Sequence, residues 1–150
     1  MTCALVPELA VSDWQRSRRF YCEVLGFSCA YDRADEGFSY LCLGAAELMI
    51  DQIGLGRDFD DGHLPDGYPF GRGLNLQIEV PDIGPLLAGL DRVGHPLFLP
   101  VEDKWYRTGS MESGNRQFVV ADPDGYLLRF FQDLGTRPAC MTPTGRSFAP

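Results

Sequence analysis

The chain is short of positive charge, of histidine and of paired cysteines, and each shortage excludes a class of protein. Thirteen Lys and Arg stand against 21 Asp and Glu, which gives a formal net charge of −8 at pH 7. Such a surface repels phosphate backbones, so nucleic-acid binding is not expected, whereas a cationic small molecule would be attracted. The same acidity would also serve solubility alone. With five cysteines, no CxxC pair and only two histidines, the spacing of a zinc site is missing.

Long apolar runs are also absent. No run reaches the ~18 residues of a membrane-spanning helix, and the opening MTCALVPELAV lacks the basic and apolar regions of a signal peptide. Scattered cysteines favour a reducing compartment. We therefore expect a cytoplasmic protein that makes no membrane contact. The length of 150 residues, with 45% hydrophobic and 23% charged residues, suits one globular domain.

Two segments of the chain are similar to each other, which predicts a duplicated fold. LVPELAVSD (5–13) and LNLQIEVPD (74–82) each alternate apolar and polar residues and end in an Asp that can cap a helix. Apolar residues at helical spacing follow both, and Gly26 and Gly94 are placed to end the two helices. Strands are then expected at 27–31, about 38–52, 97–101 and 116–132.

Each half therefore predicts a β-α-β-β-β module, and the fold class is α+β. The modules cover 5–52 and 74–132 of a single domain, 1–132, with a loosely ordered C-terminal tail at 133–150. One helix covers only one face of a four-stranded sheet. The other face is expected to be a hollow, a dimer contact, or both, so that curved mixed sheets form a cup.

Two segments without periodicity are expected to be loops at the rim of this cup. They are IGLGRDFDDGHLPDGYPFGRG (53–73) and EDKWYRTGSMESGN (102–115). A planar heteroaromatic group would stack between their rings, and a cationic one would gain from cation–π contact. Each ring has the alternative role of anchoring its loop or packing in a dimer, and Trp105 has the least local core to fill. The candidate rings are Phe38, Phe59, Tyr68, Phe70, Trp105 and Tyr106.

Near the C-terminus, NRQFVVADPDGYLLRFF (115–131) places a charged residue, Arg129, inside an apolar run. DPDG between two apolar runs predicts a hairpin. Alternation then sends Leu128 and Phe130 to the helix-packed core and Arg129 into the cup. We expect Arg129 to pair there with acidic side chains, to contact a ligand, or both. The acidic candidates on that face are Glu8, Glu47, Asp51 and Glu79.

No catalytic set is recognised in the sequence. His63 and His95 lack a partner histidine and are expected in turns. Ser12 and Ser39 lack the sequence context of a catalytic serine. GRDFDDG lacks the full pattern of a calcium loop.

Three stretches together resemble the vicinal oxygen chelate (glyoxalase/bleomycin-resistance/dioxygenase) superfamily, and within it the bleomycin-resistance proteins most: PELAVSDWQRSRRFYCEVLGF, YLCLGAAELMI and NRQFVVADPDGYLLRF. The resemblance covers about 5–132. It implies paired βαβββ modules and a domain-swapped homodimer, with an exchanged N-terminal strand and ligand grooves at the interface. The superfamily's metal ligands (His, Glu or Gln), carried over, fall on Val6, Met49, Asn75 and Arg129. That set does not suit a divalent ion.

We therefore predict a non-catalytic protein, without metal or cofactor, that confers resistance by sequestering a cationic, planar glycopeptide antibiotic of the bleomycin type. One alternative is a metal-dependent enzyme of the same superfamily (glyoxalase-type, dioxygenase or thiol transferase) with an unorthodox acidic ligand set. Another is a diverged relative that binds a different metabolite or antibiotic. The predicted ligand-binding residues are Phe38, Asp51, Tyr68, Phe70, Asn75, Trp105, Tyr106 and Arg129.

Overall fold

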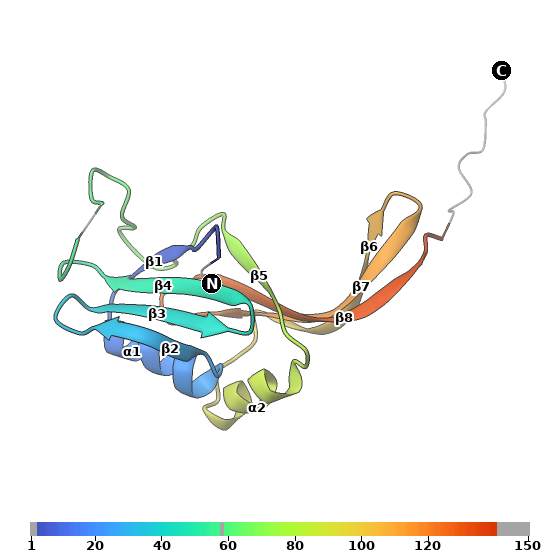
Figure 1. Cartoon of the computed structure of the whole chain (residues 1–150), viewed down its shortest axis with the longest axis horizontal. Helices are drawn as coiled ribbons and strands as arrows, with labels where there is room; N and C mark the ends of the chain where they lie inside the picture. Colours follow the sequence, from blue (N-terminus) through green and yellow to red (C-terminus); the bar gives the residue numbers. More distant parts are fainter. Residues whose placement is uncertain (1–2, 58, 141–150) are drawn as a thin grey trace, which may run out of the picture.

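The computed structural model describes residues 3–57 and 59–140, which form two modules with the same order of elements (Figure 1). The first module contains β1 (Glu8–Val11), α1 (Trp14–Arg19), a π-helix η1 (Phe20–Val24), β2 (Ser28–Arg33), β3 (Phe38–Leu43) and β4 (Ala46–Gln52). The second contains β5 (Asn75–Glu79), α2 (Gly84–Arg92), β6 (Leu99–Thr108), β7 (Met111–Ala121) and β8 (Leu127–Pro138). The predicted α+β class with two βαβββ modules is confirmed.

The two sheets have equivalent topologies. Their strand orders are β1-β4-β3-β2 and β5-β8-β7-β6. In each sheet the first strand of the module runs parallel to the last, and the other neighbours are antiparallel. Both sheets are therefore mixed, as the internal repeat of the sequence predicts.

The helix ends follow the sequence signals with two differences. The Asp13 carboxylate accepts a hydrogen bond from the Arg16 N–H at 3.0 Å, which caps α1 as predicted. Asp82 was also predicted to be a cap, but Ile83 holds the N-cap position of α2 without a side-chain hydrogen bond, and the Asp82 carboxylate accepts from the Gly84 N–H at 2.8 Å. The second difference is that the first helix ends as the π-helix η1 rather than as a continuous α-helix. No helix within the described residues is long and apolar enough to cross a membrane.

Both helices lie on the same side of the molecule, and the modules share one apolar core there (Figure 1). The close approach of the two helical segments requires Gly89, because a Cβ at that position would lie 2.0 Å from the Val24 carbonyl oxygen. We call the face of each sheet that does not contribute to this core its open face. The sheet residues buried in the core are Leu9, Val11, Leu41, Leu48, Ile50, Ile78, Val80, Phe118, Val120, Leu128 and Phe130.

The DPDG turn (122–125) joins the second module to the first through buried carboxylates. Asp122, 2% exposed, accepts hydrogen bonds from the Tyr21 hydroxyl at 2.8 Å and from the backbone N–H groups of Asp124 and Tyr126 at 3.0 and 2.9 Å. Burial nevertheless raises the pKa of Asp122 to about 6, with the hydrogen bonds opposing the shift.

The second carboxylate of this turn reaches the loop that follows β1. Asp124 accepts hydrogen bonds from the Ser12 N–H at 2.9 Å and the Ser12 hydroxyl at 2.5 Å, and Arg16 approaches it at 3.2 Å. The Tyr126 hydroxyl donates to the Ala10 carbonyl oxygen at 2.9 Å. One four-residue turn thus fixes the second sheet to both β1 and the start of α1.

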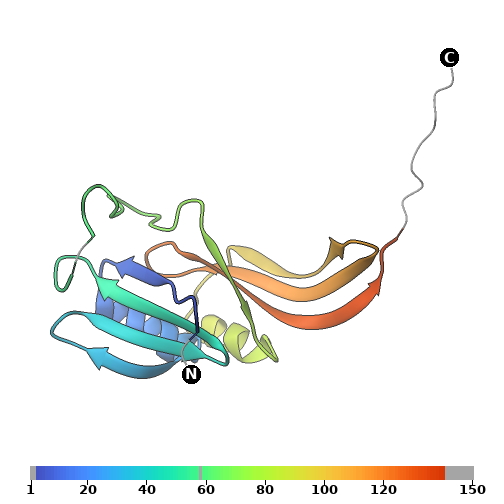
Figure 2. The ribbon, with the colours of Figure 1, turned by 45° about the horizontal axis from the view of Figure 1, so that its top comes forward.

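Strands replace the second predicted loop. Residues 102–115 form the distal parts of β6 and β7, which turn at Gly109 with φ +70°, and β8 continues to Pro138 into the segment expected to be a loose tail. Residues 141–150 lie outside the described part of the chain. This extension projects beyond the helices (Figure 2) and carries cross-strand ion pairs, Arg116 with Asp103 at 2.7 Å and Arg137 with Glu112 at 2.8 Å. Polar residues on both faces hide such strands from a search for apolar alternation.

Asp122 makes the stability of the fold depend on pH. Because the folded state raises its pKa from 3.8 to about 6, the folded state binds this proton more tightly than the unfolded state. The contribution of Asp122 to stability is therefore full below about pH 4 and is lost as the pH rises through 6. Asp122→Asn removes this titration and keeps one oxygen acceptor. Urea unfolding should show wild type losing about 2 kcal/mol relative to D122N between pH 4 and pH 7. A pH-independent difference would contradict the assignment.

Candidate functional site

Alternation along β1, β3 and β4 places acidic and aromatic side chains together on the open face of the first sheet. In register, Glu8 lies beside Met49, and Asp51 lies between Ala10 on β1 and Phe38 on β3. None of these side chains belongs to the shared core. The predicted uncovered face of the first module is therefore present, with a carboxylate from each of two neighbouring strands.

Three rings form an aromatic shelf on this face. Tyr31 stacks on Phe38 and on Tyr40, with ring centroids 5.9 and 5.3 Å apart. The Arg33 guanidinium lies over the Phe38 ring at 3.8 Å. Phe38 is only 3% exposed and Tyr31 is 49% exposed, so an incoming ring would stack on Tyr31 rather than on the predicted Phe38.

Sequence reasoning missed Tyr31 because of an irregularity in β2. The register between β2 and β3 shifts between Cys29 and Tyr31, which brings Tyr31 opposite Tyr40 on the open face. Simple alternation along the strand does not contain this shift. Tyr31 is the last residue of the strand predicted at 27–31, and its aromatic ring there was the one signal that pointed to it.

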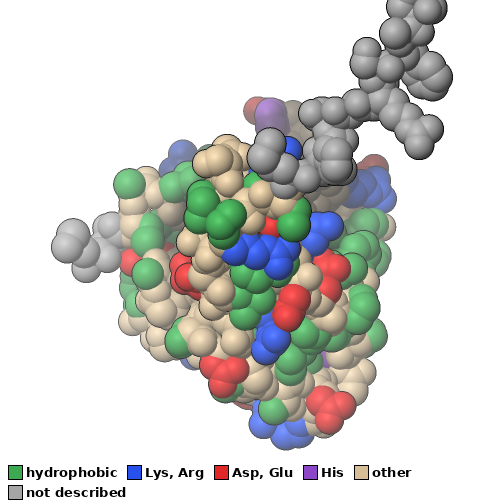
Figure 3. Space-filling view, turned by 90° about the vertical axis from the view of Figure 1, so that its right-hand side faces the viewer, with side chains coloured by type: hydrophobic (Ala, Val, Ile, Leu, Met, Phe, Trp, Pro, Cys, Tyr) green, Lys and Arg blue, Asp and Glu red, His purple; other side chains and the backbone are tan. Residues whose placement is uncertain are grey.

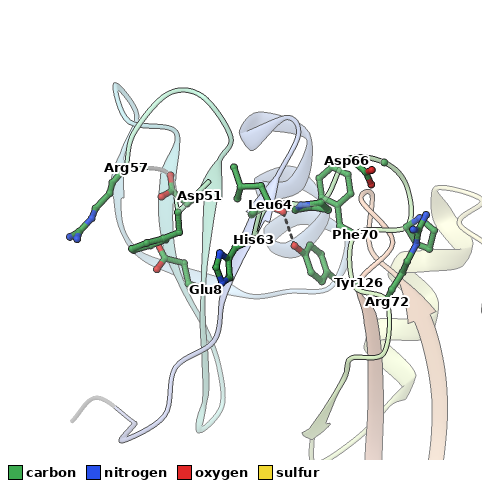
Figure 4. Close-up of a pocket in the computed structure, with 14 residues that line it drawn as sticks. Glu8, Asp51, Arg57, His63, Leu64, Asp66, Phe70, Arg72 and Tyr126 are labelled. Carbon is green, nitrogen blue, oxygen red and sulfur yellow. Dashed lines mark hydrogen bonds between the residues drawn. The ribbon is translucent and has the colours of Figure 1, made fainter. Parts of the chain in front are cut away.

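A cavity of about 410 Å³ lies between this face, residues of the 57–72 loop and Tyr126, which follows the DPDG turn (Figure 4). Glu8 and Asp51 form one wall, Phe70 and Tyr126 lie opposite, and His63 projects between them, whereas Arg57 extends away from the carboxylates. The predicted residues Asp51 and Phe70 thus meet in one cavity. The full lining is Glu8, Ala10, Asp51, Arg57, Phe59, His63, Leu64, Pro65, Asp66, Gly67, Pro69, Phe70, Arg72 and Tyr126.

The loop that closes this cavity rests on the DPDG turn. The Phe70 N–H donates to the Asp124 carbonyl oxygen at 2.8 Å, and the rings of Phe70 and Tyr126 meet edge to face at 6.3 Å. A Cβ on Gly71 would lie 2.7 Å from the Tyr126 ring. The close approach of loop and turn therefore requires a glycine, and the shape of the cavity depends on it.

A second hollow, of about 440 Å³, lies beside β5 and β8. Two of the predicted residues, Tyr68 and Asn75, line it. Leu74, Phe98 and Leu127 give it a largely apolar wall, and Tyr68 and Phe98 are both exposed.

Arg129 and Tyr106 meet on the open face of the second sheet. Arg129 Nη1 donates to the Tyr106 hydroxyl oxygen at 3.3 Å. Gln117 Nε2 donates to the same oxygen at 2.7 Å and to Glu102 Oε1 at 2.9 Å. These four residues connect β6, β7 and β8 in one polar network. The predicted orientation of Arg129, away from the core and into an open face, is confirmed.

The expected partners of Arg129 are different from the observed ones. None of the ion pairs within residues 3–57 and 59–140 includes Arg129. Glu8, Glu47 and Asp51 lie on the other sheet. The Glu47 carboxylate instead accepts hydrogen bonds from the Tyr40 hydroxyl and the Cys3 N–H, and the hydrogen bond to Glu47 raises the pKa of Tyr40 to about 12.

Trp105 lies on the opposite face of β6 from Tyr106, because both belong to a strand and not to a loop. Its ring packs on Gly114, where a Cβ would come within 2.7 Å, and the Arg137 guanidinium lies 3.9 Å from the ring centroid. Trp105 therefore shares no site with Tyr106 or Phe38 within one chain. The eight predicted residues divide among the acidic cavity and its aromatic shelf, the second hollow, the Arg129 network and the Trp105 position.

The positions that correspond to metal ligands in superfamily enzymes do not fit a divalent ion. Met49 lies on the open face of the first sheet, and Asn75 and Arg129 lie on the second. A thioether and a single amide are poor ligands for such an ion, and a guanidinium repels it. Elsewhere in the described part of the chain, no group of three or more His, Cys, Asp or Glu could hold a metal.

Comparison with known proteins shows what the chain is similar to. No family model matches the chain. Bleomycin resistance proteins of Geobacillus stearothermophilus and Staphylococcus aureus are 29% identical to it over 136 residues, 86% of this chain and 96% of theirs. A glyoxalase/bleomycin resistance protein/dioxygenase superfamily member from Vibrio splendidus is 37% identical in sequence over 86% of this chain and 97% of its own, with a TM-score of 0.38. The chain is therefore similar in sequence to proteins named bleomycin resistance proteins.

Solved structures with lower identity share the fold of this chain. TioX from Micromonospora sp. ML1 is 21% identical, with a TM-score of 0.65 over 88% of this chain and all (100%) of its own. Lactoylglutathione lyase from Agrobacterium tumefaciens is 13% identical, with a TM-score of 0.55 over 86% and 92% of the two chains. Since one of these is named as an enzyme, the fold alone does not decide between binding and catalysis.

The cavity depends on a contact that one methyl group would break. Gly71→Ala places a Cβ against the Tyr126 ring, which should displace the loop and cost about 1–3 kcal/mol of unfolding free energy. Gly67→Ala is the matched control, because nothing lies within 4 Å of a Cβ there. Thermal unfolding and limited proteolysis within 53–73 measure both effects. Equal behaviour of the two variants would show that the loop does not rest on the turn.

Proposed function

We propose that the protein confers resistance to a bleomycin-type antibiotic by binding the drug non-covalently, so that free drug is depleted by mass action. The observation that carries the proposal is the acidic cavity with Glu8 and Asp51 on one wall and aromatic rings on the other. The similarity to proteins named bleomycin resistance proteins supports the same assignment.

The cavity and the aromatic shelf complement a flat cation. A positive group in the cavity would contact two carboxylates and the faces of Phe70 and Tyr126, which combines ionic and cation–π attraction. Asp51 lies directly opposite Phe38, so the cavity adjoins the shelf, and a planar group would stack on Tyr31. The net charge of −8 adds long-range attraction for a cation.

Binding is favoured over metal-dependent catalysis because of the donors that the open faces present. A metal ion that polarises a substrate needs about three anionic or imidazole ligands that converge on it. Met49, Asn75 and Arg129 do not provide them. The open face of the first sheet instead carries aromatic rings and the neighbouring carboxylates of Glu8 and Asp51, which can bind an organic cation without a chemical reaction.

We also propose that the binding unit is a homodimer. The extension carries Trp105 beyond the helices that cover the rest of its sheet, and hydrophobic, basic and acidic side chains mix on that end of the molecule (Figure 3). A second copy would cover this end and close the open faces into grooves. In this chain the Met49 N–H donates to the Pro7 carbonyl oxygen at 2.8 Å, a contact that an exchanged N-terminal arm would reproduce between chains.

Calorimetric titration with metal-free bleomycin tests the site directly. Wild type should bind with a Kd of about 1 µM or tighter. Tyr31→Ala should weaken binding by more than about 1 kcal/mol through lost stacking. Glu8→Gln and Asp51→Asn should each weaken it about fivefold and reduce its salt dependence.

Asp91→Asn is the matched control for these variants, because it removes an exposed carboxylate from α2 on the helix side. It should bind like wild type. No binding by wild type at micromolar concentration would reject bleomycin as the ligand. Equal losses in D91N and D51N would reject the cavity as the site.

Light scattering on a sizing column tests the dimer. Wild type should elute with twice the mass of one chain at micromolar concentration. Trp105→Ala should shift it towards monomer and weaken drug binding by more than about 1 kcal/mol. Lys104→Ala, an exposed change on the same strand, is the control. A monomeric wild type that binds the drug as tightly as expected would contradict the dimer proposal and leave the cavity intact.

A further inference from the structure

Arg129 carries a charge with unusual surroundings. It is half-buried, its Nη1 donates a hydrogen bond to the Tyr106 hydroxyl, and its Nε is closed to solvent without a hydrogen-bond partner among the described residues. Leu127 and Phe131 flank it on β8, and Val119 lies opposite on β7. A hydrogen bond from an acceptor to such a guanidinium is strong, because its apolar neighbours do not compete for the charge.

Two side-chain amides lie beside Arg129 on the same face. Gln77 is its register partner on β5, and Asn75 is the partner of Leu127. Both are exposed, so their N–H groups are available to a ligand. Arg129 on β8 and the amides of Gln77 and Asn75 on the neighbouring edge strand β5 thus share one face of the sheet, and we call these three residues the donor row.

Two carboxylates on this face decide which acceptor suits the donor row. Glu79 lies two positions after Gln77 on β5, and Glu102 is joined to the Arg129 network through Gln117. A carboxylate ligand would accept from Arg129 but would have no N–H to donate to Glu79 or Glu102. A carboxamide matches both kinds of group, because its carbonyl oxygen accepts from Arg129 or Gln77 while its N–H donates to a carboxylate.

The second hollow adjoins the donor row at Asn75. The second hollow, of about 440 Å³, reaches Asn75 and Leu127, and its outer wall includes Tyr68 and Phe98. We infer that the open face of the second sheet binds a carboxamide group on a flat or apolar body, with the carbonyl oxygen on the donor row and the body in the second hollow. The inference rests on the proposed function in that the open faces hold a small molecule, but it does not require that molecule to be bleomycin.

Nuclear magnetic resonance with small probes tests this without the drug. The probes are nicotinamide, which is a ring with a carboxamide, nicotinate, which has a carboxylate in its place, and pyridine. Nicotinamide should shift the side-chain amide signals of Asn75 and Gln77 and the Nε–H signal of Arg129 in a saturable way, with a Kd on the order of millimolar. Nicotinate and pyridine should bind at least about fivefold more weakly.

Arg129→Met should abolish the nicotinamide shifts. Arg116→Met is the matched control, because Arg116 lies on the opposite face of the same sheet, paired with Asp103, and it should leave binding unchanged. If R129M perturbs the spectrum of the whole protein, Arg129→Lys replaces it. That variant keeps the charge but loses the planar fork, and it should weaken binding at least about fivefold.

Three results would overturn the inference. They are absence of saturable shifts with nicotinamide, tighter binding of nicotinate, and nicotinamide binding that neither R129M nor R129K weakens. The two proposals fail separately. Loss of nicotinamide binding in a protein that still binds bleomycin rejects only the carboxamide site, and the reverse result rejects only the drug.

Discussion

Two buried carboxylates in one turn hold the molecule in the arrangement on which its function depends. Asp122 binds the Tyr21 hydroxyl, and Asp124 binds Ser12, so the end of the second module is fixed to the start of the first. With this tie in place both helices face one shared core, and the other face of each sheet is left for ligands or a second chain. The same turn supports the 53–73 segment through Phe70, so the cavity depends on the tie as well.

The open faces of the two sheets differ in charge and therefore in what they attract. The first presents Glu8 and Asp51 beside stacked rings, which suits a flat organic cation. The second presents Arg129 in a network with Tyr106, beside exposed amides, which suits a neutral group that can accept and donate hydrogen bonds. Under the two proposals, a ligand with a cationic part and an amide-rich part would be recognised at both ends.

The sequence predicted those features that depend on local patterns. The internal repeat, the Asp13 cap and the orientation of Arg129 follow from alternation, helical spacing and capping chemistry, and the structure has all three. Features that depend on distant contacts were missed. Trp105 was expected in a loop because strands held by cross-strand ion pairs show no apolar alternation. Tyr31 reaches the open face through a register shift between β2 and β3. The shape of the cavity depends on the close approach of Gly71 to the Tyr126 ring. Neither feature can be read from a local sequence pattern.

Recovery of the drug after binding is the most direct test of sequestration. Metal-free bleomycin is incubated with an excess of purified protein, and free and bound drug are separated by ultrafiltration. The bound drug is then released by denaturation, and its mass is measured by mass spectrometry. The account predicts that nearly all of the drug is retained with the protein and is recovered with an unchanged mass. A product of different mass, or drug that passes the filter as freely as it does without protein, would contradict it.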